Sequence, residues 1–141
     1  MTASTINTVI LNPSPTRADI YMTLVSAGTQ ESGTVVYDSS AVATAAGDGV
    51  DTKTCTIESI YCSSSCANTC RLLFYFDAST PVLAFDVPPG QSPVQIDFKR
   101  NISVGGLKNT GGAGITGDIT LTSTGLASGD AITLVLEMRR N

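Results

Sequence analysis

Four cysteines form the one cluster in this chain whose residue type and spacing can do chemistry. Cys55, Cys62, Cys66 and Cys70 follow one another at intervals of seven, four and four residues. Four thiolates can hold a zinc ion, although the usual paired cysteines of a zinc site are spaced more closely than these. Alternatively, Cys62 and Cys70 can be bridged across the tip of a hairpin, and Cys66 can reach Cys55 if the loop folds back. The third alternative is free thiols in a cytoplasmic protein. With zinc or a bridge, the role is to brace a hairpin, because a redox centre prefers Cys-x-x-Cys.

Other residue types give little support for catalysis. Histidine is absent, which removes the commonest general base, the histidine-activated nucleophiles and the commonest metal ligand. A carboxylate pair must face across a cleft, but the aspartates lie mostly at expected strand ends and turns, where they bond to their own backbone. These are Asp19, Asp38, Asp48, Asp51, Asp77, Asp118 and Asp130. We therefore expect no enzyme and no cofactor, with zinc as the one metal the cysteines allow.

A glycine-rich segment, residues 105–117, suggests a phosphate loop but lacks its context. A phosphate cradle follows a strand, precedes a helix and carries a lysine in its last turn. Here a strand follows, and Lys108 comes early in the segment. We interpret it as a flexible loop that packs against a neighbouring protein or stays mobile.

The elements that must position these residues are almost all strands. Alternating or β-branched runs are separated by turn signals at short spacing, and no amphipathic helix of about ten residues appears. Strands are expected at 5–11, 19–27, 34–38, 53–62, 71–77, 81–87, 94–99, 118–124 and 130–139, with a helical turn at 40–46 and a clear turn at 88–91. The last two strands are expected to pair as an antiparallel hairpin. This pattern predicts one all-β domain over 1–141, an antiparallel β-sandwich or jelly roll of about eight to nine strands.

Composition limits the partners. Charged residues are 14% of the chain, well below the typical share, while 19 Thr and 15 Ser supply many uncharged hydroxyls. The net charge of −4 and the absence of basic clusters argue against nucleic acid. The pairs Lys99-Arg100 and Arg139-Arg140 are interpreted as solvated strand ends. No apolar run is long enough to span a membrane, and no signal peptide is visible, so synthesis in the cytoplasm is expected.

The order of strand and turn motifs resembles a family of small structural proteins of tailed-phage virions. The likeness covers most of the chain and consists of turn-and-strand patterns. Its segments are 17–21, 28–32, 36–40, 55–60, 71–74, 76–80, 88–91, 97–98, 105–107, 116–119 and 128–139. The cysteine-rich stretch 62–70 departs from the family's pattern, which leaves the bracing of this region open.

The resemblance implies a component of the virus particle, located in the virion after synthesis in the host cytoplasm. A protein of this size looks most like a capsid decoration or cement protein, commonly a trimer, that contacts the major capsid protein. The expected contact segments are an N-terminal arm or edge strand, 1–12, and the 105–117 loop; the alternative is an ordinary edge strand and a disordered loop. Candidate contact residues are Thr5, Ile6, Val9, Ile10, Gly105, Gly106, Leu107, Gly111 and Gly112.

Two alternatives remain open at this point. One is a head–tail connector or a tail- or fibre-associated component. The other is a carbohydrate-binding surface module, which stacks sugars on exposed aromatic rings. Tryptophan is absent, and of the four tyrosines only Tyr37 and Tyr61 lie near expected loops.

Overall fold

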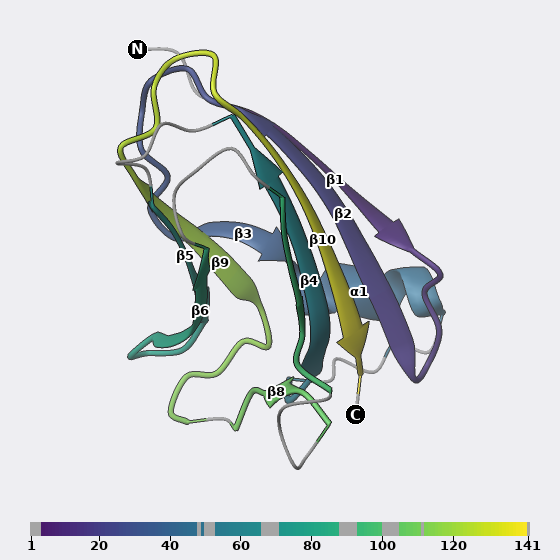
Figure 1. The fold of residues 1–141 in the computed structure, drawn as a ribbon. Helices are drawn as coiled ribbons and strands as arrows, with labels where there is room; N and C mark the ends of the chain where they lie inside the picture. Colours follow the sequence, from purple (N-terminus) through teal and green to yellow (C-terminus); the bar gives the residue numbers. More distant parts are fainter. Residues whose placement is uncertain are drawn as a thin grey trace.

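The structure is a computed structural model that describes residues 4–47, 49, 53–65, 71–87, 93–99, 105–110 and 112–140. Within them, two antiparallel sheets face each other as a sandwich, with one short helix beside them (Figure 1). The expected turn at 88–91, Asp48 and Asp51 lie outside the described residues.

The larger sheet, called sheet A, has the strand order β1-β2-β10-β4-β7, with β8 also paired to β4. Sheet B has the order β3-β9-β5-β6. The strands of sheet A are β1 Thr5–Leu11, β2 Arg17–Val25, β4 Thr56–Ser64, β7 Val94–Asp97, β8 Leu107–Lys108 and β10 Ala131–Arg139. Those of sheet B are β3 Thr34–Tyr37, β5 Arg71–Phe76, β6 Val82–Val87 and β9 Ile119–Thr124.

The pairing of these strands is nested. β2 pairs with β10, β3 with β9, β4 with β7 and β5 with β6. A chain paired in this way is one long antiparallel ribbon wrapped into two sheets, which is the topology of a jelly roll. The prediction of an all-β jelly roll is therefore confirmed.

Alternation along the strands builds the core between the sheets. In β2, Ile20, Met22 and Leu24 are buried, while the residues between them face outward. β10 repeats this pattern in the middle of sheet A, and Phe74 of β5 stacks on Phe85 of β6 within sheet B. Apolar residues every second position give each strand one face for the core.

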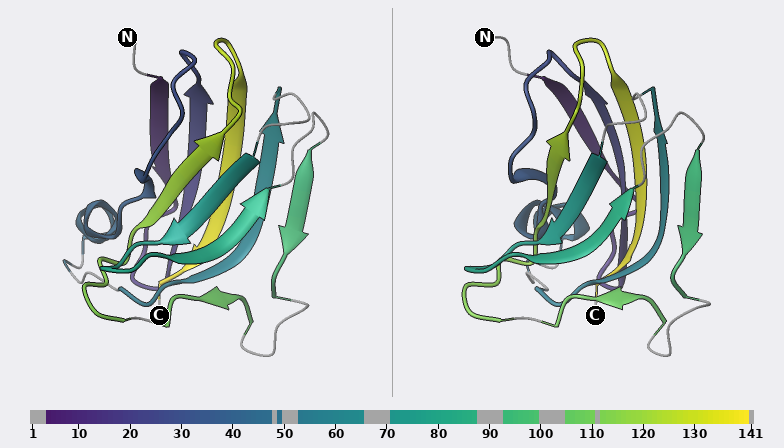
Figure 2. Two further views of the ribbon diagram at one scale, coloured as in Figure 1. Left: turned by 90° about the vertical axis from the view of Figure 1, so that its left-hand side faces the viewer. Right: turned by 60° about the vertical axis from the view of Figure 1, so that its left-hand side comes forward.

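The helix α1, Ser39–Ala46, lies between β3 and β4 along the chain and near the β3 edge of the sandwich (Figure 2). The side chain of Asp38 caps its first turn by accepting bonds from the backbone N–H groups of Ser40 and Ala41. Gly47 ends it in the left-handed conformation at φ 77°. Val42 and Ala43 are the apolar side chains that α1 buries.

The predicted C-terminal hairpin is wrong. β9 and β10 have the expected bounds to within a residue, but β9 lies in sheet B and β10 in sheet A. The connection between them, residues 125–130, crosses the roughly 10 Å between packed sheets. Leu126 of this connection is buried beneath the crossing. Alternation alone does not distinguish a strand that pairs with its neighbour from one that crosses to the other sheet.

The glycine-rich segment is more ordered than expected. Its start forms β8, which pairs with Thr56 and Ile57 of β4 and brings the Gly106 backbone against that strand. A Cβ on Gly106 would lie 2.6 Å from the Ile57 carbonyl oxygen. At the other end, a Cβ on Gly117 would lie 2.9 Å from the Cα of Lys53. The glycines at both ends thus allow close packing within the chain itself, where the sequence suggested a free loop.

Candidate interaction surfaces

The outer face of sheet A carries a straight row of side chains across five strands. Val9, Tyr21, Val135, Tyr61 and Gln95 stand opposite one another in the registers of β1, β2, β10, β4 and β7. Each alternates with inward-facing core residues along its strand. Tyr21 is 40% exposed and Tyr61 is 37% exposed. Two strand spacings separate them, so their backbones lie about 10 Å apart.

The row on one side of the tyrosines is charged, because Asp19, Glu137 and Asp97 align in it. The two rows on the other side contain no charged residue. One row is Asn7, Thr23, Thr133 and Ser63, and the next is Thr5, Val25 and Ala131. Together with the row that holds the tyrosines, they form the surface that we call the tyrosine face. It combines exposed aliphatic and aromatic groups with short hydroxyl and amide side chains, an environment suited to contact and poorly suited to ionic chemistry.

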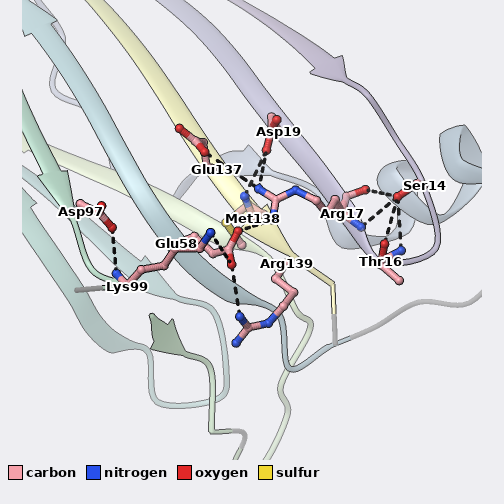
Figure 3. Close-up of polar contacts among 10 residues, drawn as sticks. All are labelled: Ser14, Thr16, Arg17, Asp19, Glu58, Asp97, Lys99, Glu137, Met138 and Arg139. Atoms are coloured by element: carbon pink, nitrogen blue, oxygen red, sulfur yellow. Dashed lines mark hydrogen bonds and ion pairs between the residues drawn. The ribbon is translucent and has the colours of Figure 1, made fainter. Parts of the chain in front are cut away.

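The charges of this sheet gather at its other end, around Glu58 (Figure 3). The register between β4 and β10 shifts here: Ser59 stands opposite Glu137 and Ile57 opposite Met138, which leaves Glu58 as the extra residue of a β-bulge. Its side chain is only 3% exposed. It pairs with Arg17, with Lys99 at 3.5 Å and with Arg139 at 3.2 Å.

The surrounding cations hold Glu58 ionised. Burial raises the pKa of Glu58, but the hydrogen bond from Arg17 and the charges of Arg17, Lys99 and Arg139 outweigh it and lower the pKa below its ordinary value. Arg17 is correspondingly held charged, because its bond to Glu58 raises its pKa. A general acid needs a raised pKa, so this carboxylate suits a structural tie between β2, β4 and β10.

A carboxylate next to this cluster behaves in the opposite way. Burial raises the pKa of Asp19, and this effect exceeds the lowering by the bond from the Met138 backbone N–H and by the charge of Arg17. Glu137 and Glu58 add to the rise.

Sheet B has a cavity of about 380 Å³ on its outer side. Its lining is mainly hydroxyl and small side chains with one aromatic ring and one carboxylate: Ser32, Gly33, Tyr75, Asp77, Pro81, Thr120 and Thr122. The carboxylate, Asp77, accepts a hydrogen bond from the Thr116 hydroxyl at 2.9 Å. A second carboxylate or another base does not occur among the lining residues, so the cavity lacks the pair that acid–base catalysis uses.

The described cysteines do not come together. Cys55 and Cys62 are both buried, but Cys55 lies just before β4 and Cys62 near the end of this strand, roughly 20 Å apart along an extended chain. One zinc ion therefore does not take both as ligands. The Sγ of Cys55 lies 3.3 Å from the Tyr37 hydroxyl and donates to the Arg140 carbonyl oxygen. The hairpin that a bridge was expected to brace is not formed either, because β4 and β5 lie in different sheets.

Cys66 and Cys70 lie outside the described residues, so their pairing stays a prediction. In the described part of the chain, no group of three or more His, Cys, Asp or Glu side chains is placed to hold a metal ion.

Most of the candidate contact residues are located by the structure. The N-terminal candidates form β1, an edge strand in which Thr5 and Val9 are exposed and Ile6 and Ile10 are half-buried. Gly105, Gly106 and Leu107 lie at β8, where Gly106 is buried, while Gly112 is exposed. Gly111 and residues 1–3 lie outside the described residues. β1 thus remains a candidate surface, while the start of the loop serves internal packing.

The interpretation of the basic pairs as solvated strand ends holds for Lys99, which follows β7 with a side chain 53% exposed, and is wrong for Arg140. Lys99 and Arg139 also pair with Glu58. Arg140 is only 1% exposed, and its guanidinium donates to the Ser14 carbonyl oxygen at 2.8 Å. The expectation that Tyr37 and Tyr61 are the tyrosines near loops also changes. Tyr37 is fully buried, and Tyr61 lies within β4. Tyr21 was missed, although its place between the buried Ile20 and Met22 marks it as outward-facing.

Comparison with known proteins gives no family. No family model matches the chain, and no curated protein matches it. Among solved structures, a family 29 carbohydrate-binding module is similar over 98% of this chain and 89% of its own, at 7% identity and a TM-score of 0.38. A point mutant of a family 29 module gives 96% and 92% coverage, 7% identity and a TM-score of 0.37. Likeness at this level carries no argument about function. No helix among the described residues is long and apolar enough to cross a membrane.

Proposed function

We propose that this chain is a non-catalytic structural protein of a tailed-phage particle, a capsid decoration protein that acts by contact with the major capsid protein. The tyrosine face is the observation that carries the proposal. Protein interfaces are depleted of charge at their centre and enriched in tyrosine, and this face has both properties over three rows of a rigid sheet. The resemblance of the sequence to virion structural proteins is the reason for proposing a phage particle as the location and the major capsid protein as the partner.

The contact is tested by sedimenting empty or expanded heads with the purified chain. We expect the wild-type chain to bind the heads at micromolar concentration and to raise their melting temperature. The double variant Tyr21→Ala/Tyr61→Ala should weaken binding at least about tenfold, because truncating two aromatic anchors removes much of an interface's free energy. Tyr75→Ala on sheet B is the matched control and should bind normally. Absence of head binding by the wild-type chain would refute the proposal.

A carbohydrate-binding module is the second candidate, favoured by the alignment of Tyr21 and Tyr61. Their separation of about 10 Å along a straight row suits the stacking of two sugar rings of an extended chain. Thr23, Thr133, Ser63 and Gln95 surround the rings with hydrogen-bonding groups of the kind that fix sugar hydroxyls.

A glycan array and pull-down on insoluble polysaccharides separate the two candidates. The carbohydrate candidate predicts retention that is lost in Tyr21→Ala and in Tyr61→Ala and kept in Tyr75→Ala. If the array shows no glycan binding and the chain binds heads, only the decoration proposal is supported.

A further inference from the structure

The edge strand β1 lacks the features by which proteins protect exposed sheet edges. Every hydrogen bond that the structure gives to the β1 backbone runs to β2, and its other edge has no partner within the described part of the chain. In Figure 2, β1 borders sheet A with no strand beyond it. An unpaired edge presents a row of N–H and C=O groups to any chain that can pair with it.

The other sheet edges differ from β1 in this respect. β3 and β7 are only four residues long. β6 contains a register shift against β5 and carries Asp86, which pairs with Arg71. Short strands, bulges and charges each discourage pairing with another chain. β1 has seven residues, an unbroken register against β2, no proline and no charged residue.

The sequence of β1 fits a second copy of itself. Antiparallel pairing about a two-fold axis at Thr8 places Thr8 opposite Thr8, Ile6 opposite Ile10, and Asn7 opposite Val9. Residues directly opposite in an antiparallel pair point to the same face, so both isoleucines stay on the core side and Val9 stays on the tyrosine face. No charged pair arises that would oppose the contact.

From these observations we infer that β1 is a homodimerisation edge, which joins two copies of sheet A into one continuous sheet. The contact adds about six to eight inter-strand hydrogen bonds over a strand of seven residues. It is a two-fold contact, distinct from the trimer that the sequence resemblance implied, and it does not depend on the proposed function.

Charge substitutions at the two-fold axis test the inference. The purified full chain should form a species of twice the 14.6 kDa chain mass across the micromolar to millimolar range in sedimentation equilibrium. Thr8 is exposed, so Thr8→Lys and Thr8→Glu should fold. Each variant alone places like charges directly opposite and should raise the dimer dissociation constant about tenfold or more. A one-to-one mixture of the two variants should recover a heterodimer, because the charges are then opposite in sign.

Gln95→Lys, on the opposite edge strand β7, is the matched control and should dimerise as the wild type does. If Thr8→Lys fails to fold by circular dichroism, Asn7→Lys and Asn7→Glu provide a second pair at an exposed position of the same strand. The two copies of position 7 lie on the diagonal across the axis, about 7–8 Å apart, where long charged side chains still meet. A wild-type monomer at millimolar concentration would overturn the inference. So would a dimer or trimer that neither pair of variants affects, or variants that each lose dimerisation and do not recover it when mixed.

Discussion

At the scale of single residues, Glu58 is the most consequential position in the molecule. A β-bulge positions this carboxylate so that three cations surround it. The cations are Arg17 of β2, Arg139 at the end of β10 and Lys99, which follows β7. The sequence did not identify it, because Glu58 sits among alternating residues of an expected strand. A bulge depends on how two strands distant in sequence register, which no local pattern encodes.

Replacing Glu58 by glutamine should make stability less dependent on pH. The pKa of Glu58 is lowered in the folded state, so its contribution is complete above the ordinary value of 4.5 and is lost as pH falls through the folded-state pKa. Glu58→Gln should cost about 1 to 2 kcal/mol near neutral pH, and the difference from wild type should shrink as the pH falls below 4.5.

Urea unfolding of both proteins at several pH values measures this difference. Asp19, whose pKa is raised by burial, changes stability in the opposite sense, but it does so in both proteins and largely cancels. A difference between the two proteins that stays constant with pH would show that Glu58 is not held ionised by its neighbours.

At the scale of elements, sequence reasoning succeeded for individual strands and failed for their partners. The bounds of β5 and β10 follow from alternation to within a residue, whereas β2 begins and ends two residues before its expected range. The helical turn at 40–46 corresponds to α1, whose cap at Asp38 and end at Gly47 are local signals. The pairing of β9 with β10 was wrong, and β8 was not expected. Both depend on contacts between segments far apart in the chain, and two residues of β8 are too few for a periodic pattern.

Gly106 offers a test of how tightly β8 is fixed to β4. Gly106→Ala should destabilise the fold by about 1 to 3 kcal/mol, because the added Cβ meets the Ile57 carbonyl oxygen at 2.6 Å and the φ of 150° is unfavourable for alanine. Gly112→Ala is the control, since its φ of 139° is similar and no atom lies within 4 Å of the added Cβ. Thermal unfolding of both compares the crowding directly. An equal loss of stability in the two variants would mean that only the backbone conformation matters. The contact between β8 and β4 would then accommodate the added Cβ at little cost.

At the scale of the whole molecule, the wrapped pairing of the jelly roll leaves two outer sheet faces with different characters. Sheet A presents the uncharged tyrosine face and, at one border, the unprotected strand β1. Sheet B presents a cavity lined by hydroxyl groups. The sequence predicted a contact protein from its few charges and many hydroxyls, and it singled out β1. It did not identify the tyrosine face, because that surface exists only when strands β1, β2, β10, β4 and β7 are set side by side in register.

The decoration proposal is tested most directly by quantifying this chain against the major shell protein in purified particles. Mass spectrometry with labelled peptides of both proteins gives the ratio. The proposal predicts many copies per particle, in a fixed proportion to the shell protein. Particles that lack the chain, or that contain only the few copies of a single ring, would contradict it.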